Sequence, residues 1–279
     1  MLTNGQIIRQ ISNLYTVRVG SSIYGCRARG KFRQEKISPV VGDNVLVDLD
    51  KNVITEIKER KNILQRPVIA NVDVAFIIAS TKNPNLDLNL LDKLISVITF
   101  NDITPVICFT KLDLLTEKNK EMITNLKKYY EMIGIKVFYN TEITEIKKYI
   151  KGKIVVLAGQ TGAGKSSLLN KLDSSLNIKT AEISQALGRG KHTTRHVELY
   201  SIAGGYIADT PGFSALNLSD ISIDQLKYTF AEFQNYECKF RNCLHNKEKE
   251  CKVKEAVDNK KILQSRYNNY ILFMEEISK

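Results

Sequence analysis

The sequence predicts an α/β fold with three parts: a doubly wound, mostly parallel sheet flanked by an N-terminal OB-fold β-barrel and a C-terminal helical module. Three observations predict it. Short alternating apolar runs fill residues 1–65, strand-like and helix-like runs alternate over 66–225, and a Cys/His cluster lies within 226–279. Repeated β–α alternation is typical of a doubly wound sheet, and short strands of even spacing are typical of a small barrel.

Composition indicates an ordinary globular protein. A chain of 279 residues with 43% hydrophobic and 25% charged residues suggests more than one domain. No apolar run approaches the roughly 20 residues of a membrane span, and the N-terminus carries no signal-peptide pattern. We therefore expect a cytoplasmic protein that contacts no membrane.

The formal net charge of +11 is unevenly distributed, because residues 1–65 hold 11 Lys and Arg against 6 Asp and Glu. A basic excess favours a polyanionic partner, most simply nucleic acid. A Lys-rich composition without functional meaning remains the alternative.

The N-terminal segment predicts strands at "LYTVRV", "SIYGCRAR", "NVLVDLD" and "NVITEIKER". Cations interleaved with aromatic residues suggest a surface that binds RNA by phosphate contact and base stacking. The alternative is a solvated barrel whose aromatic residues are core. The residues expected on this surface are Arg18, Arg27, Arg29, Lys31, Arg33, Tyr15, Tyr24 and Phe32.

The most specific motif is "GQTGAGKS", which matches G-x-x-x-x-G-K-[ST] between a strand-like and a helix-like run. Its glycines let backbone N–H groups converge on phosphates at the start of a helix. We expect Lys165 to bridge the β- and γ-phosphates in catalysis and Ser166 to ligate Mg²⁺. The nucleotide-binding residues expected here are Gly159, Gln160, Thr161, Gly162, Ala163, Gly164, Lys165, Ser166 and Ser167.

Two downstream segments complete a phosphate site. Asp209 and Gly212 of "DTPG" follow a strand-like run, where a carboxylate can hold Mg²⁺ and an amide can meet the γ-phosphate. Between the two motifs lies "GRGKHTTRH", residues 188–196, in which Thr194 is the expected second Mg²⁺ hydroxyl and Thr193 the next candidate. A basic RNA-contacting loop is a compatible interpretation of the same segment.

The stretch "TKLD", Thr110–Asp113, ends the apolar run "PVICF". Asp113 can accept hydrogen bonds from N1–H and the exocyclic amine of guanine, a donor pair that adenine lacks. The stem of Lys111 can lie over the base, and Thr110 completes the motif. A turn before a helix that begins near Thr116 is the alternative, but the other three motifs favour guanine recognition.

The motif set is complete but rotated, with the guanine motif ahead of the phosphate loop. This order resembles the ribosome small-subunit-dependent GTPase family of bacteria, most specifically in "GQTGAGKSSLLN", "GRGKHTTRH", "DTPGF" and the Cys/His spacing. The resemblance implies a circularly permuted, Mg-dependent GTP hydrolase that is monomeric. It also implies that the small subunit stimulates hydrolysis, that the protein binds its rRNA, and that it helps release an assembly factor.

The chain departs from the family pattern at two positions. Thr110 stands where Asn is commoner, which we expect to weaken one polar contact, and Thr141 replaces a Ser-Ala element that contacts the base. Phe213 follows "DTPG" where many GTPases carry a Gln that orients water. His192 is therefore the candidate catalytic residue, with a solvent or RNA contact as the alternative.

Cys238, Cys243, His245 and Cys251 give C-x4-C-x-H-x5-C, the ligand set of a closed structural Zn²⁺ site. Reduced thiols by coincidence are the alternative. Cys26 and Cys108 stand alone in apolar runs and are expected to be buried, reduced thiols. One helical pattern running from Val253 to Ile277 is expected to pack on the body of the protein.

Two other functions remain to be tested against GTP hydrolysis. A small-molecule kinase would use the phosphate loop but needs an acceptor-binding lid, where this chain has "TKLD" and the Cys/His cluster. A non-catalytic RNA-binding protein would leave the intact phosphate motif without a role.

Overall fold

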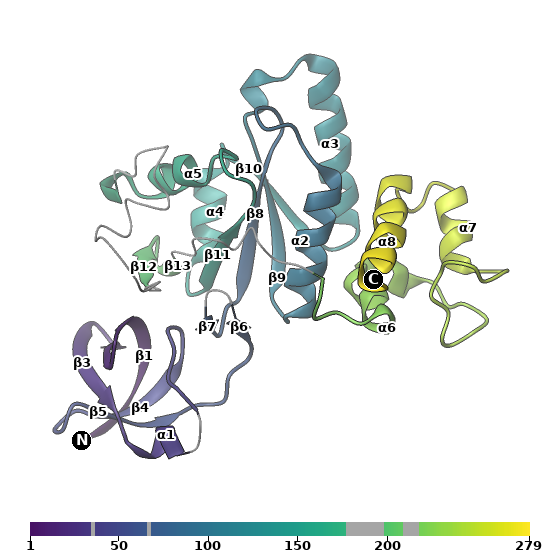
Figure 1. Ribbon diagram of the computed structural model, residues 1–279. Helices are drawn as coiled ribbons and strands as arrows, with labels where there is room; N and C mark the ends of the chain where they lie inside the picture. The colour runs from purple at the N-terminus through teal and green to yellow at the C-terminus, as the bar shows by residue number, and fades with distance from the viewer. Residues whose placement is uncertain (35–36, 66–67, 177–197, 209–217) are drawn as a thin grey trace. The chain divides into compact units, whose positions relative to one another are not determined.

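The computed structural model describes residues 1–34, 37–65, 68–176, 198–208 and 218–279 (Figure 1). The chain forms two compact units, each assembled from segments distant in sequence. The first contains Met1–Ala75, Glu142–Leu157 and Lys165–Phe213, and the second contains Phe76–Thr141, Ala158–Gly164 and Ser214–Lys279. The division into domains at residues 65 and 225 stays a prediction.

The first unit begins with a closed five-stranded barrel in the order β1-β2-β3-β5-β4. All neighbouring strands are antiparallel except β3 and β5, which are parallel. The predicted barrel is therefore confirmed. Its elements are β1 Leu2–Ile11, β2 Leu14–Val19, β3 Ser22–Ala28, α1 Lys31–Gln34, β4 Asn44–Asp48 and β5 Val53–Ile57.

Strand β1 was not predicted, because its sequence does not alternate cleanly. Ile7 and Ile8 are adjacent and both buried, and the pairing with β2 shifts register between Ile7 and Arg9. A bulge of this kind lets neighbouring residues point to the same side and hides the period of two.

The expected aromatic surface of the barrel is wrong in part. Tyr15 and Phe32 are buried in the core, Tyr24 is half-buried, and Arg18 is half-buried with its guanidinium over the ring of Tyr206. The rings of Tyr15 and Phe32 therefore join the buried apolar residues of this part and cannot stack on a base. The cations Arg27, Arg29 and Lys31 are exposed as expected, and the side chain of Arg33 lies outside the described residues.

The rest of the first unit contains further paired strands and helices. Strands β11 and β13 pair in parallel, and β12 pairs antiparallel with β13. Strands β6 and β7 form a separate antiparallel pair. These elements are β6 Ile63–Gln65, β7 Val68–Ala70, α4 Ile143–Ile150, β11 Ile154–Ala158, α5 Lys165–Leu172, η2 Ser174–Leu176, β12 Leu199–Ile202 and β13 Gly205–Ala208.

The second unit has the strand order β10-β9-β8, with helices between successive strands. Every residue of β8 is buried, as its continuous apolar run predicts, and β9 and β10 are parallel. Cys108 is buried, as is Cys26 of the barrel. The elements are β8 Val74–Ser80, α2 Leu88–Phe100, β9 Thr104–Thr110, η1 Leu112–Leu114, α3 Glu117–Met132 and β10 Lys136–Tyr139.

The C-terminal part of the second unit contains two helices where one helical pattern was expected. Helix α7 ends at Asp258 and α8 begins at Gln264, with Lys260 in the left-handed region between them. Helix α8 packs on α2, so the predicted packing on the body of the protein is confirmed. The elements are α6 Ile223–Leu226, η4 Lys227–Thr229, η5 Ala231–Asn235, α7 Lys252–Asp258 and α8 Gln264–Ile277.

Within the described part of the chain, no helix combines the length and the apolar character that crossing a membrane requires.

Candidate functional sites

The glycine-rich loop begins directly after β11 and presses its backbone against β8. Gly159 has φ of +126°, and a Cβ at this position would lie 2.4 Å from the carbonyl oxygen of Ile78. Only glycine combines that backbone angle with so close an approach. The first glycine of the motif is therefore required by the path of the chain alone.

Thr110 joins the guanine motif to the glycine-rich loop. Its buried hydroxyl donates to the carbonyl oxygen of Ala163 at 2.6 Å, and a Cβ on Gly164 would lie 3.6 Å from that hydroxyl. The carbonyl of Thr110 in turn accepts from the hydroxyl of Thr81 at 2.9 Å. Threonine in place of the commoner asparagine thus keeps a polar contact between the two segments.

The remaining residues of the guanine motif turn out of β9 into η1. Lys111 has φ of 60° in the left-handed region, and its ammonium group donates to the carbonyl oxygen of Asn83. Asp113 lies in η1 with its carboxylate exposed. The carboxylate of Asp113 is thus open to solvent, whereas the ammonium of Lys111 is held to the protein.

Lys165, Ser166 and Ser167 form the first turn of α5, directly after the last glycine of the loop. Burial lowers the pKa of Lys165, and Ser166 is only 3% exposed. A partly desolvated ammonium is stabilised by a nearby anion, so this position suits a phosphate. Gln160 is half-buried and Thr161 exposed.

Five expected site residues lie outside the described residues: His192, Thr193, Thr194, Asp209 and Gly212. The described strands that flank them are β12, which begins at Leu199, and β13, which ends at Ala208. The barrel contacts this region through the Arg9–Glu198 ion pair at 3.4 Å, directly before β12, and through the Arg18 guanidinium over Tyr206 of β13 at 5.3 Å. Sequence reasoning gave Arg9, Glu198 and Tyr206 no role.

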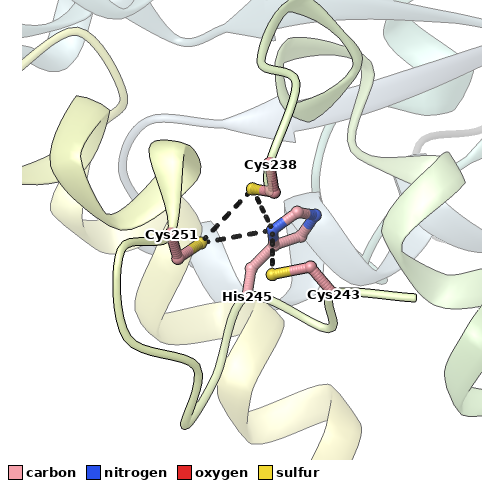
Figure 2. Close-up of side chains that lie close together, drawn as sticks. All are labelled: Cys238, Cys243, His245 and Cys251. Carbon is pink, nitrogen blue, oxygen red and sulfur yellow. Dashed lines mark hydrogen bonds between the residues drawn. The ribbon is translucent and has the colours of Figure 1, made fainter. Parts of the chain in front are cut away.

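The four predicted metal ligands converge on one point (Figure 2). Nδ1 of His245 lies 3.6, 3.4 and 3.4 Å from the sulfurs of Cys238, Cys243 and Cys251, and the sulfurs of Cys238 and Cys251 are 3.8 Å apart. A tetrahedral ion with bonds of about 2.3 Å to sulfur and about 2.0 Å to nitrogen separates its ligands by roughly 3.5–3.8 Å. The observed distances fit such an ion.

The cluster is arranged to favour a cation. Burial raises the pKa of the Cys243 thiol to about 12 and lowers the pKa of His245. Without a metal both groups therefore prefer their neutral forms. A divalent ion reverses this for the thiols, because a coordinating thiol is deprotonated. Three thiolates and one neutral imidazole around a 2+ ion carry a net charge of −1.

Several residues that sequence reasoning missed bind the backbone of residues 243–245, which carries two of the predicted metal ligands. The hydroxyls of Tyr267 and Tyr270 on α8 donate to the carbonyl oxygens of His245 and Leu244, each at 2.7 Å. The buried Lys227 donates to the carbonyl oxygen of Cys243 at 3.1 Å and so places a positive charge beside the cluster. Tyr267 and Tyr270 had the spacing of helix core positions, which gave no sign of this second role.

A buried charge cluster attaches the C-terminal part to α2. The guanidinium of Arg266, 1% exposed, donates to Asp92 on α2 at 2.8 Å and to both oxygens of Glu232 on η5 at 2.7 and 2.9 Å. Tyr130 and Asn269 donate to the carboxylate of Asp92 at 2.8 and 2.7 Å. Every oxygen of both carboxylates is thereby satisfied, as buried charges require.

Family models match most of the chain. The model described as the RsgA N-terminal domain matches residues 4–55, and the model described as the RsgA GTPase matches residues 57–219.

Curated relatives are similar over nearly the whole length. A "Small ribosomal subunit biogenesis GTPase RsgA 1" from Listeria monocytogenes serotype 4b (strain F2365) is 45% identical over 284 residues, covering 99% of this chain and 98% of that protein. A "Small ribosomal subunit biogenesis GTPase RsgA" from Clostridium beijerinckii (strain ATCC 51743 / NCIMB 8052) is 44% identical, covering 98% and 97%.

Solved structures match equally well. YloQ, described as a circularly permuted GTPase, has a TM-score of 0.86 at 38% identity, covering 100% of this chain and 96% of that one. YjeQ from Thermotoga maritima has a TM-score of 0.87 at 34% identity, with 99% of each chain covered. The rotated motif order of this chain is therefore a circular permutation of the whole domain, and the predicted fold class is confirmed.

Proposed function

This chain belongs to the RsgA family of small ribosomal subunit biogenesis GTPases and is a GTP hydrolase, and from that premise we propose how its own residues act. Hydrolysis of GTP to GDP and phosphate is stimulated by the small ribosomal subunit. The protein binds the rRNA of that subunit as a monomer and helps release an assembly factor from it.

Guanine is recognised by Asp113. The observation that carries this assignment is the 2.6 Å hydrogen bond from Thr110 to Ala163, which ties the end of β9 to the glycine-rich loop. A base bound at Asp113 and phosphates bound at the loop can then belong to one nucleotide, because the two segments are fixed to each other. Thr141, in the turn after β10, is assigned no base contact.

The phosphates are held by the loop and the start of α5. Backbone N–H groups of Gly159–Gly164 surround the phosphates, the ammonium of Lys165 bridges the β- and γ-phosphates, and Ser166 holds the Mg²⁺ that accompanies GTP. That ion neutralises charge that develops between the β- and γ-phosphates. The lowered pKa of Lys165 supports this role, since bound phosphate restores the charged ammonium.

We assign the positioning of the water that attacks GTP to the segments around His192 and Asp209. Thr194 and Asp209 complete the Mg²⁺ site, with Thr193 as the alternative hydroxyl, and the amide of Gly212 meets the γ-phosphate. The apolar side chain of Phe213, directly after "DTPG", cannot orient water, so we assign this role to His192. Slow hydrolysis without the ribosomal subunit follows from this arrangement.

The Cys/His cluster holds one structural Zn²⁺. Three thiolates and an imidazole make a closed site with no open position for a substrate, which suits zinc and excludes a direct part in hydrolysis. The exposed cations Arg27, Arg29 and Lys31 of the barrel supply phosphate contacts to rRNA.

One experiment tests the assignment: phosphate release from GTP and from ATP, each with and without small ribosomal subunits. We expect release from GTP alone, with stimulation by subunits. Asp113→Asn should shift the preference to xanthosine triphosphate, because a purine with an oxygen at C2 requires a donor from the protein. Equal turnover of ATP and GTP by the wild type would contradict guanine recognition, and ATP turnover with a small acceptor would favour a kinase.

A second measurement separates binding from catalysis. Lys165→Ala should abolish turnover, whereas His192→Ala should lower subunit-stimulated turnover and leave the affinity for GTP unchanged. A loss of GTP affinity in His192→Ala would make this residue a binding residue instead.

A further inference from the structure

A pocket with a volume of about 360 Å³ opens beside the Cys/His cluster. All of its lining residues fall between Lys227 and His245, so it belongs to one local segment of the second unit. Buried Phe233, Cys243 and His245 form part of its wall. Its volume is at the lower end of the range for small-molecule pockets, which fits one monomer of a polymer better than a folded partner.

Two large aromatic rings at this pocket are exposed. Tyr228 is 60% exposed and Phe240 is 51% exposed, while Tyr236 is half-buried. A cation accompanies each exposed ring: Nζ of Lys227 lies 5.3 Å from the centre of Tyr228, and Nζ of Lys239 lies 5.9 Å from the centre of Phe240. Rings that fold into no core and lie beside cations offer stacking faces to a ligand.

The charge of the lining is positive. Three cations, Lys227, Lys239 and Arg241, and one carboxylate, Glu237, line the pocket. Lys239 also pairs with Glu250 at 3.0 Å, but both side chains are more than half exposed, so solvent weakens that pair. The pocket therefore attracts an anion while its rings favour a flat ligand.

We propose that this pocket binds one unpaired nucleotide of RNA, with the base stacked on Tyr228 or Phe240 and its phosphates beside Lys239 and Arg241. A duplex cannot enter a pocket of this volume, whereas loops, bulges and strand ends present bases that stack on aromatic side chains. An acidic peptide would match the charge but would leave both ring faces unused. The proposal rests on the proposed binding of rRNA and names the part of the RNA that the Cys/His segment takes.

The test uses the zinc-loaded full chain and a fluorescein-labelled heptaadenylate RNA, with affinity measured by anisotropy at one fixed salt concentration. Tyr228→Ala and Phe240→Ala should each weaken binding, the stronger of the two by roughly 5- to 150-fold. Tyr228→Phe and Phe240→Tyr should keep the wild-type affinity. Leu272→Ala, which truncates a side chain 52% exposed on α8 outside the pocket, is the control and should change nothing.

Charge and stacking are separated by two further measurements. Arg241→Ala should weaken binding and reduce the slope of affinity against salt by about one unit, while Lys247→Ala, an exposed cation outside the pocket, should have a smaller effect. A blunt RNA duplex should bind wild type and Phe240→Ala equally. Polyglutamate that displaces the RNA from wild type and from both alanine variants equally would show a polyanion surface and overturn the proposal.

Wild-type RNA affinity in both Tyr228→Ala and Phe240→Ala would also overturn it. This failure is distinct from failure of the proposed function, which is measured by subunit-stimulated release of phosphate from GTP. Loss of RNA affinity in the variants would support the pocket even if subunits failed to stimulate GTP hydrolysis by the wild-type protein. That failure would contradict the proposed function alone.

Discussion

The glycine-rich loop and the Cys/His cluster are two binding sites built in opposite ways. The loop forms by omitting side chains: Gly159 lets the backbone pass Ile78, and main-chain groups are left to face a ligand. The cluster forms by converging four side chains, which Tyr267, Tyr270 and Lys227 hold in place. From this difference we infer that the loop is fixed by the fold around it, whereas the cluster should depend on a bound ion for its stability.

The largest test of this difference is removal of the metal. A structural Zn²⁺ contributes about 10–16 kcal/mol of apparent binding free energy coupled to folding. With a strong chelator we expect amide exchange at Leu244 and Asn246 to become fast, while amides of β8 and β9 stay protected. Unchanged protection at Leu244 and Asn246 after complete loss of the ion would show that the cluster is as independent of its ligand as the loop.

The next test concerns the charge cluster that attaches the C-terminal part. Arg266→Met should lower the free energy of unfolding by about 3–5 kcal/mol, because it leaves the carboxylates of Asp92 and Glu232 buried without a positive charge to neutralise them. Lys93→Met is the matched control on the same pair of helices, since it breaks the partly exposed Lys93–Glu276 pair and should cost less than about 1 kcal/mol. Urea denaturation measures both, and equal costs would contradict the assignment.

A smaller effect is expected at the loop itself. Gly159→Ala should cost about 1–3 kcal/mol of stability through its backbone angle, and more if Ile78 cannot move, and should weaken GTP binding. Gly134→Ala has a comparable φ of +87° with open space around its Cβ, so it isolates the backbone term and should leave GTP affinity unchanged. Thermal unfolding and nucleotide titration distinguish the two variants.

The smallest effect is expected at Thr110. Thr110→Val keeps the shape of the side chain and removes its hydrogen bond to the buried Ala163 carbonyl, which should cost about 1–3 kcal/mol or less. Thr110→Ser should behave as wild type. Affinity for a fluorescent GTP analogue should fall in the valine variant only, and an equal fall in both would show that the methyl group, not the hydroxyl, matters.

The sequence predicted the parts of both sites that depend on local spacing. The four metal ligands lie within 14 residues and the phosphate motif within 8, so their chemistry was visible without a structure. Contacts over long separations were not visible: Arg266 and Asp92 are 174 residues apart, and Thr110 and Ala163 are 53 apart. Tyr15 was placed on the surface because composition cannot say which face of a barrel strand points inward, and Phe32 because the short helix α1 was not predicted.

The Asp92–Arg266–Glu232 cluster limits where the chain can be shortened without loss of stability. A gene fragment that stops at residue 225 would encode Asp92 and Val97 without the guanidinium and the apolar residues that cover them. The C-terminal part is thus not independent of α2, although its compact Cys/His motif suggests a separate module. A cut between α2 and η5 would separate the buried Asp92 from the guanidinium of Arg266 that neutralises it.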